Sequence, residues 1–321
     1  MPTPLPESEV RRLLDPEQLI AAIEFAFRNR FPSITIPDRT IAHLPHGMFL
    51  TMSCYDAATP ALGMKLVMLH NQEPAQTGLN AGRVQATYLL LDPETAEPRL
   101  TISANYLTDL RTAATSAVAT KFLARPDSET LGIFGTGRLA RTHIKVLPRV
   151  RDFRRVLICG RDPGRTSEFV REASVESSAI QIAAADLRTC AAESDVICTC
   201  TSSSTPVFDG RDLRPGTHLN LVGTFQPHAR EADTATMQRA NVVMVDTHAT
   251  AQSEFGELLL AQKEKALPHS PVTADLHELV SGKKPGRKAP EEITVFKSVG
   301  CALEDLVAAE LLLAAQSHER V

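Results

Sequence analysis

Residues 135–140 read Gly-Thr-Gly-Arg-Leu-Ala, which is a G-x-G-x-x-A sequence. An apolar run at residues 131–134 leads directly into it, and apolar residues at helical spacing follow from about residue 139 to residue 147. A glycine turn between a strand and a helix is the arrangement that binds a dinucleotide in Rossmann-type domains. The context, more than the short motif itself, predicts a Rossmann-type fold for the middle of the chain.

The residues of this turn have separate physical roles. Gly135 permits the tight turn, Gly137 lets the backbone approach a pyrophosphate, and Ala140 lets the helix and the strand pack closely. The N–H groups and the positive dipole end of the following helix favour an anion. The alternative is a glycine turn without a ligand. The predicted pyrophosphate-binding residues are Gly135, Thr136, Gly137, Arg138, Leu139 and Ala140.

Strand-like and helical segments alternate through this part of the chain. The strand-like runs are residues 131–134, 156–159, 196–199, 218–222 and 242–245. Such alternation predicts an α/β domain with a doubly wound parallel sheet.

The first hundred residues have a different pattern. A helical pattern covers residues 17–30, and short β-rich runs follow at 48–54, 63–69 and 85–91, which predicts an antiparallel sheet. Thr108 is a suitable N-cap for a helix through residue 123. An amphipathic helix at 303–315 is expected to pack back on this first domain. We therefore predict a discontinuous α+β domain, residues 1–115 and 296–321, around a Rossmann domain at 116–295.

Length and composition exclude several classes of protein. A chain of 321 residues favours two domains, and a net charge of −4 with scattered lysines and arginines argues against nucleic acid as a partner. We find neither an apolar run long enough to span a membrane nor a signal-peptide pattern, so we expect a cytoplasmic protein without a membrane partner. The six cysteines are spread thinly and lack metal-ligand spacing, so no metal is predicted.

The cofactor's adenosine ribose should lie after the second strand, where the sequence reads Gly160-Arg161-Asp162. An acid there usually binds the 2′-hydroxyl of NAD, whereas an arginine accommodates the 2′-phosphate of NADP. Arg161 comes first and Arg165 is near, so we favour NADP, with NAD the alternative that Asp162 supports. Thr201 and Ser202 follow the strand at 196–199 and are predicted to line the cofactor groove.

Four stretches outside the glycine motif carry a family resemblance. They read GMKLV at 63–67, LTDLRTAA at 107–114, ATKFL at 119–123 and FKSVGCALED at 296–305. With them, the chain resembles the ornithine cyclodeaminase/mu-crystallin family over nearly its whole length. The resemblance implies a homodimer in which the first domain and the C-terminal helix supply the subunit contact and the substrate pocket. It also implies cofactor contacts near the nicotinamide at Val222, Gly223, Ser298 and Gly300, and we add Thr112 to the predicted cofactor residues.

The same resemblance implies that Arg39, Lys65 and Arg111 are the substrate-binding and catalytic residues. The chemistry is consistent, because guanidinium groups bind a carboxylate through charge-assisted hydrogen bonds. Arg111 is expected at the start of a helix, and Lys65 lies in an apolar strand where burial without an anion would be costly. The alternative is that each basic side chain forms a structural ion pair.

One departure from the family pattern bears on the reaction. The family's cyclodeaminases have an aspartate shortly after the fourth strand's glycine, and that carboxylate handles the distal amine of the substrate. This chain has Phe225 at the corresponding place. A phenyl ring cannot accept a proton, so the chain is more similar to the family's ketimine reductases.

We therefore expect an NAD(P)H-dependent oxidoreductase acting on C–N bonds. Its substrate would be Δ1-pyrroline-2-carboxylate or Δ1-piperideine-2-carboxylate, reduced by hydride transfer to C2 to give L-proline or L-pipecolate. In this reaction Arg39 and Arg111 would bind the carboxylate, and Lys65 would add charge and relay a proton. The alternatives are an ornithine cyclodeaminase, an alanine-dehydrogenase-like enzyme, and an NADPH-dependent small-ligand-binding protein of mu-crystallin type. Histidine can act as a proton donor, but His70 and His228 are interpreted as exposed loop residues.

Overall fold

The computed structural model describes residues 4–70, 84–267 and 269–319. It divides into two compact units: unit 1 comprises Met1–Arg111 and Cys301–Val321, and unit 2 comprises Thr112–Gly300. The predicted domain boundaries, at residues 115/116 and 295/296, lie close to these divisions. The predicted fold class, a doubly wound parallel sheet with a discontinuous α+β unit, is confirmed.

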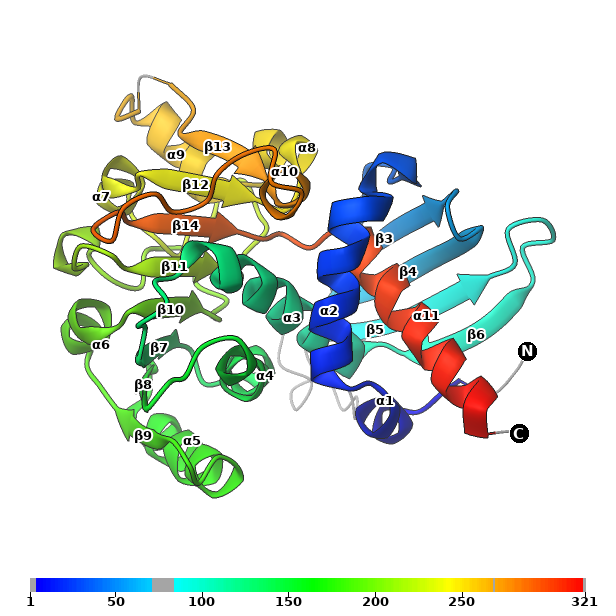
Figure 1. Cartoon of the computed structure of the whole chain (residues 1–321), viewed down its shortest axis with the longest axis horizontal. Helices are drawn as coiled ribbons and strands as arrows, with labels where there is room; N and C mark the ends of the chain where they lie inside the picture. Colours follow the sequence, from blue (N-terminus) through cyan, green and yellow to red (C-terminus); the bar gives the residue numbers. More distant parts are fainter. Residues whose placement is uncertain (1–3, 71–83, 268, 320–321) are drawn as a thin grey trace. The chain divides into compact units, whose positions relative to one another are not determined.

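Unit 1 is built on an antiparallel sheet of order β1-β3-β4-β5-β6, with β2 paired to β3. Its described strands are β1 (Ile34–Thr35), β2 (Thr40–Leu44), β3 (Gly47–Asp56), β4 (Ala61–His70), β5 (Val84–Leu91) and β6 (Pro98–Ser103). Its helices are α1 (Glu7–Leu13), α2 (Pro16–Phe25) and α11 (Ala302–Glu319), and α3 (Asn105–Leu123) begins here. Helix α11 packs on β3, β4 and β5, and α2 packs against α11 (Figure 1).

Strand β4 has two distinct faces. Ala61, Gly63, Lys65 and Val67 are buried, whereas the residues between them are half-buried. Because side chains along a strand point alternately to opposite faces, the buried set faces α11, where Lys65 contacts Asp305. The other face of β4 is also apolar, since it carries Leu62, Met64, Leu66 and Met68.

Some local predictions are wrong. The predicted helix at 17–30 is α2 only as far as Phe25, and a π-helical segment, Ala26–Arg30, follows with a 3-10 turn at Phe31–Ser33. Helix α3 begins at Asn105, so Thr108 lies inside the helix and Arg111 lies in its second turn. The earlier start has a tertiary cause, because the Asn105 side chain accepts a hydrogen bond from the backbone N–H of Ala86 on β5 at 2.8 Å.

Unit 2 contains a parallel sheet of eight described strands in the order β13-β12-β14-β11-β10-β7-β8-β9 (Figure 1). The strands are β7 (Thr130–Phe134), β8 (Arg155–Cys159), β9 (Gln181–Ala184), β10 (Val196–Thr199), β11 (His218–Leu221), β12 (Val242–Val245), β13 (Val272–Asp275) and β14 (Thr294–Lys297). The sequence order of the strands reverses direction between β7 and β10. This point is the topological switch, where doubly wound sheets bind their ligands.

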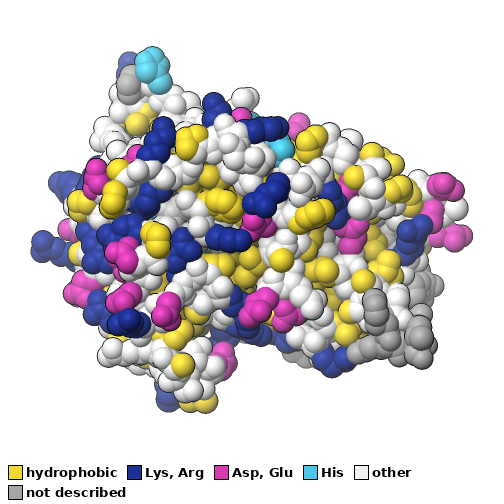
Figure 2. Space-filling view, in the orientation of Figure 1, with side chains coloured by type: hydrophobic (Ala, Val, Ile, Leu, Met, Phe, Trp, Pro, Cys, Tyr) yellow, Lys and Arg dark blue, Asp and Glu magenta, His cyan; other side chains and the backbone are white. Residues whose placement is uncertain are grey.

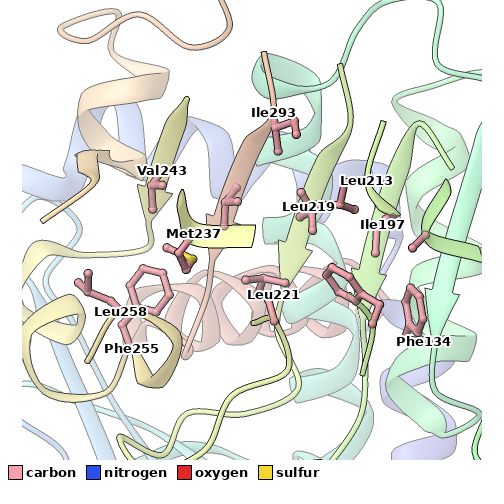
Figure 3. Close-up of a cluster of buried hydrophobic side chains, with 14 of the residues drawn as sticks. Phe134, Ile197, Leu213, Leu219, Leu221, Met237, Val243, Phe255, Leu258 and Ile293 are labelled. Carbon is pink, nitrogen blue, oxygen red and sulfur yellow. The ribbon is translucent and has the colours of Figure 1, made fainter. Parts of the chain in front are cut away.

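Helices connect these strands. They are the remainder of α3, then α4 (Arg138–Val146), α5 (Pro163–Glu176), α6 (Leu187–Glu193), α7 (Thr234–Arg239), α8 (His248–Ser253), α9 (Gly256–Lys263) and α10 (Leu276–Val280), with 3-10 turns at Leu147–Arg149 and Gly210–Asp212. Figure 3 shows Phe134, Ile197, Leu219 and Val243 on the sheet strands, with Phe255 and Leu258 packed beside them. This apolar layer fixes the strand ends that carry the predicted cofactor residues.

The visible surface carries charges of both signs. Figure 2 shows Lys and Arg side chains interspersed with Asp and Glu, without one continuous basic patch on the visible face. Within the described part of the chain, no helix is long and apolar enough to cross a membrane.

Candidate active site

The glycine loop follows β7 at the topological switch of unit 2. Gly135 has φ +119°, and a Cβ there would lie 2.5 Å from the carbonyl oxygen of Cys200, so both backbone conformation and packing require glycine. Gly137 is the N-cap of α4, and a Cβ there would meet no described protein atom within 4 Å. Ala140 is fully buried. The fold itself therefore requires Gly135 and Ala140, whereas Gly137 borders open space, as predicted for a backbone that a pyrophosphate approaches.

The segment after β8 contains the predicted ribose-binding residues. Asp162 is the N-cap of α5, and its side chain accepts a hydrogen bond from the backbone N–H of Arg165 at 2.8 Å. Arg161 and Arg165 are exposed. One carboxylate oxygen of Asp162 is thus engaged in capping, a role that the sequence prediction did not consider.

The other predicted cofactor residues of unit 2 lie mainly at the carboxyl edge of the sheet. Val222 and Gly223 follow β11, and Thr201 and Ser202 follow β10. Ser298 and Gly300 follow β14, which pairs with β11. Thr112 is different, because it lies in α3 and is 8% exposed. The fold brings the residues that follow β10, β11 and β14 to one edge, as expected for a cofactor groove.

In unit 1, Lys65 and Arg111 meet at one carboxylate. The Nζ of Lys65 lies 2.7 Å from Oδ2 of Asp305, and Nε of Arg111 donates to Oδ1 of Asp305 at 3.0 Å. Arg111 also donates to Glu304 at 2.7 Å. Glu304 and Asp305 are fully buried at the start of α11. Two cations and two anions therefore form a balanced cluster, called here the ion cluster.

The anion beside the buried Lys65 comes from the chain itself. Lys65 was expected to need a substrate anion to compensate its burial, but Asp305 supplies that anion within the chain. Burial and the neighbouring Arg111 nevertheless lower the pKa of Lys65 to about 8, although Asp305 opposes them. Burial also acts on Arg111, but Asp305 and Glu304 outweigh it and raise the pKa of this side chain. Arg111 stays cationic, whereas Lys65 titrates near the physiological range.

Arg39 is the third basic residue of the predicted substrate site. It is half-buried and directly precedes β2. Thr40 pairs with Thr51, and Met52 pairs with Lys65, so continuing the β2–β3 ladder by one residue would put Arg39 in the same row as Lys65. The register of the last pair, Thr40 with Thr51, thus leaves Arg39 one residue beyond β2, at the end of the row that contains Met52 and Lys65.

The sequence prediction missed Tyr88, which pairs directly with Lys65 across β4 and β5. Tyr88 is 1% exposed, and its hydroxyl has no hydrogen-bond partner among the described residues. Burial, with a smaller contribution from Asp305, raises the pKa of Tyr88 well above its usual value. A Cβ at Gly63 would lie 1.9 Å from this hydroxyl, so Gly63 makes room for the Tyr88 ring beside Lys65.

One group of possible metal ligands occurs among the described residues. The side chains of His248, Asp275 and Glu278 have ligand atoms within 4.8 Å of one another. Asp275 and Glu278 form a capping box at the start of α10, and Glu278 shares a hydrogen bond with His248 at 2.8 Å. These local hydrogen bonds account for the group without an ion.

Comparison with known proteins identifies the family. The model of the ornithine cyclodeaminase/mu-crystallin family matches residues 5–318. A Δ1-pyrroline-2-carboxylate reductase from Bacillus cereus is 33% identical over 308 residues, covering 95% of this chain and 94% of its own length. The chain belongs to the ornithine cyclodeaminase/mu-crystallin family.

Solved structures support this assignment. The Δ1-pyrroline-2-carboxylate reductase of Thermococcus litoralis, in complex with NADH and L-proline, has a TM-score of 0.92 and 34% identity, covering 99% of this chain and 98% of that chain. An archaeal alanine dehydrogenase dimer with bound NAD has a TM-score of 0.89 and 29% identity, covering 99% and 96%. The family fold therefore extends over both units.

Phe225 is the residue by which the sequence departs from the cyclodeaminase pattern. This residue is half-buried in the loop after β11, the position at which the sequence resemblance predicts an aspartate in a cyclodeaminase. His228 is exposed in the same loop, and His70 ends β4 half-buried. Within the described residues, neither histidine has contacts that indicate a catalytic role, so both remain outside the candidate site.

The two glycines of the loop should respond differently to alanine. Gly137→Ala adds a methyl group in open space, so the melting temperature should stay within about 2 °C of wild type while NAD(P)H binding weakens about 10-fold or more. Gly135→Ala should lower the melting temperature, because its methyl group would clash with Cys200. Thermal melts and cofactor fluorescence titrations test both. Unchanged cofactor affinity in Gly137→Ala would remove this loop from the binding site.

Proposed function

We propose that the protein is an NAD(P)H-dependent reductase of cyclic imine carboxylates, converting Δ1-pyrroline-2-carboxylate or Δ1-piperideine-2-carboxylate to L-proline or L-pipecolate. The observation that carries the proposal is the match over 99% of the chain to a reductase that holds NADH and L-proline. The relative from Bacillus cereus is also a Δ1-pyrroline-2-carboxylate reductase. The proposal assigns the cofactor to unit 2 and the substrate carboxylate to the basic residues of unit 1.

The charges of unit 1 suggest how the carboxylate binds. The ion cluster is balanced, because Lys65 and Arg111 face Asp305 and Glu304. An additional buried carboxylate would leave an excess of negative charge, which is costly. Arg39 supplies the additional positive charge in this proposal. Arg111, held by two carboxylates, would orient the substrate rather than provide most of its attraction.

The reaction requires one hydride at C2 of the imine and one proton at its nitrogen. A bound reduced nicotinamide supplies the hydride. Arg39 and Arg111 would hold the substrate carboxylate, which fixes the orientation of C2. Lys65, with a pKa of about 8, would keep a positive charge at neutral pH and would donate the proton that the imine nitrogen requires.

The sequence of the chain links the two sets of residues at both crossings between units. Arg111 is followed directly by Thr112, the first residue of unit 2. Gly300, the last residue of unit 2, is followed by the start of α11 with Glu304 and Asp305. Arg111, a predicted substrate residue, is therefore adjacent in sequence to Thr112, a predicted cofactor residue, and the two carboxylates of the ion cluster follow Gly300 within five residues.

NADPH is proposed as the preferred cofactor, with NADH as the alternative. Arg161 and Arg165 are exposed after β8, where a 2′-phosphate would bind, and Asp162 already caps α5. The two solved relatives hold NADH and NAD. The preference rests on the two arginines of this chain. A cytoplasmic location also stays a prediction.

We propose that the protein is a homodimer in which the face of the unit 1 sheet opposite α11 contacts a second copy. Leu62, Met64, Leu66 and Met68 are half-buried there, and Tyr55, opposite Leu62, is 37% exposed. The archaeal relative with 29% identity is described as a dimer. An apolar sheet face of this kind is stabilised when a second copy covers it.

The proposed reaction is tested by following NADPH and NADH oxidation with pyrroline-2-carboxylate, piperideine-2-carboxylate, and pyruvate with ammonia. We expect the cyclic imines to give the highest kcat/KM and NADPH to exceed NADH. Arg39→Ala should lower kcat/KM for the imine about 10- to 100-fold without changing NADPH binding, because it removes a charge-assisted bond to the carboxylate. A preference for pyruvate with ammonia, or ammonia release from ornithine, would contradict the assignment.

The charge of Lys65 predicts a pH profile. Its pKa of about 8 lies below the ordinary lysine value, so the side chain is cationic below pH 8 and loses its charge as pH rises. We expect kcat/KM for the imine to fall above about pH 8 in wild type. Lys65→Arg stays charged, so its residual activity should lack this decline. Identical profiles would show that the decline belongs to the substrate or to another group.

The dimer predicts a mass of about 70 kDa by sedimentation velocity, twice the 34.9 kDa of one chain. Met64→Asp should shift the protein toward the monomer, because it places a charge in the proposed interface. Val175→Asp is a matched control, since this apolar residue of α5 is 80% exposed. A monomeric wild type, or an equal effect of both substitutions, would reject this interface.

A further inference from the structure

The carboxyl edge of the unit 2 sheet contains a buried carboxylate from Glu231, which is 0% exposed. Its oxygens accept four hydrogen bonds: from Oγ1 of Thr199 at 2.8 Å, from N and Oγ1 of Thr201 at 2.8 and 2.6 Å, and from N of Gly223 at 2.7 Å. Backbone N–H groups in loops beyond parallel strands lack ladder partners and need other acceptors. Glu231 therefore joins the loop after β10 to the loop after β11.

A second buried carboxylate accepts hydrogen bonds from the backbone of the loop after β14. Asp246 directly follows β12 and is 1% exposed. It accepts hydrogen bonds from the backbone N–H groups of Val299 and Gly300, both at 2.8 Å, and from Oγ of Ser298 at 3.3 Å. Gly300 has φ +91°, a conformation that favours glycine. Asp246 thus fixes a turn of unusual backbone geometry.

Lys297 connects this edge further. Its Nζ donates to the carbonyl oxygen of Thr224 at 2.7 Å and lies 3.0 Å from Oε2 of Glu257. Glu257 in turn accepts a hydrogen bond from the backbone N–H of Glu231 at 3.0 Å. Burial raises the pKa of Glu231, and Lys297 opposes that effect. The end of β14 is therefore tied to the loop after β11 by a hydrogen bond to Thr224, and to α9 by the ion pair with Glu257.

The loops held in this way have little freedom to shift. A Cβ at Gly223 would lie 2.2 Å from the carbonyl oxygen of Thr201 and 2.4 Å from Oε1 of Glu231. The two loops therefore touch through backbone atoms, with the carboxylate between them. Movement of either loop would break several of the hydrogen bonds described above.

We infer that Glu231 and Asp246 are positioning residues for the nicotinamide half of the cofactor. Gly223, Ser298 and Gly300 are the predicted nicotinamide contacts, and the two carboxylates hold the backbone at these residues. The inference rests on the proposed cofactor role of this edge. Neither carboxylate needs to touch the cofactor. Both carboxylates act by fixing the geometry of the loops before the cofactor binds. The free-energy cost of ordering the loops on binding is therefore lower.

The test measures cofactor binding without an imine. In a fluorescence titration of NADPH or NADH, Glu231→Gln and Asp246→Asn should each raise the dissociation constant about 10-fold or more, because a side-chain amide cannot accept all of these hydrogen bonds. With imine present, the KM for the cofactor should rise more than the KM for the imine. Thr201→Val removes the hydroxyl that donates to Glu231 and accepts from the backbone N–H of Ser203, but it keeps the carboxylate, so it should have a smaller effect in the same direction.

Asp195→Asn is the matched control. Asp195 is 5% exposed, directly precedes β10, and accepts hydrogen bonds from the backbone N–H groups of Glu129 and Thr130, both at 2.9 Å. It lies at the amino edge of the sheet, so its substitution should lower the melting temperature but leave the cofactor dissociation constant within about twofold.

The outcomes separate the inference from the proposed reaction. Weakened binding in Glu231→Gln and Asp246→Asn, with normal binding in Asp195→Asn, supports the inference even if wild type reduces no imine. Wild-type affinity in both variants, or equal weakening in Asp195→Asn, overturns it. If Glu231→Gln does not fold, unchanged cofactor affinity in Thr201→Val overturns the part that concerns Glu231. A wild-type protein that binds neither cofactor overturns the inference and the proposed function together.

Discussion

The organisation of unit 1 depends on the ion cluster that joins the C-terminal helix to the sheet. Asp305 binds Lys65, which lies 240 positions earlier in the sequence, and Arg111, which lies 194 positions earlier. Removing one member of a buried ion pair typically costs about 3–5 kcal/mol, because a charge is left uncompensated. The cluster therefore selects one placement of α11 on β4, and the discontinuity of unit 1 follows from that placement.

Both units use buried charge to fix the residues of the candidate site. In unit 1 two carboxylates orient Lys65 and Arg111, and in unit 2 Glu231 and Asp246 hold loop backbone at the strand ends. Each buried charge is matched by an opposite charge or by several hydrogen bonds, as low exposure demands. Because these contacts exist within each unit, the geometry of the candidate residues in that unit does not depend on a ligand.

The sequence predicted the parts of the structure that depend on local patterns. The glycine loop, its flanking strand and helix, and strands β10 and β12 follow from apolar runs and from glycines with a steric requirement. The partners of Lys65 were not predictable in this way, because Asp305 is distant in sequence and the apolar pattern of α11 does not reveal which acidic residues are buried. Tyr88 was missed for a similar reason, since its proximity to Lys65 depends on strand register. The helix start at Asn105 also depends on a contact with β5.

The ion cluster also reduces the positive charge that two of the three predicted substrate residues present to an anion. From the sequence, Arg39, Lys65 and Arg111 are equivalent, as three cations available to one carboxylate. In the structure, Lys65 and Arg111 are already neutralised by Asp305 and Glu304, so they attract an anion less than their formal charge suggests. Arg39 precedes β2 and is half-buried, and the proposed function assigns to it an additional positive charge for the substrate carboxylate. In the proposed function, affinity and orientation therefore belong to different residues: Arg39 would attract the carboxylate, and the rigidly held Lys65 and Arg111 would determine its orientation.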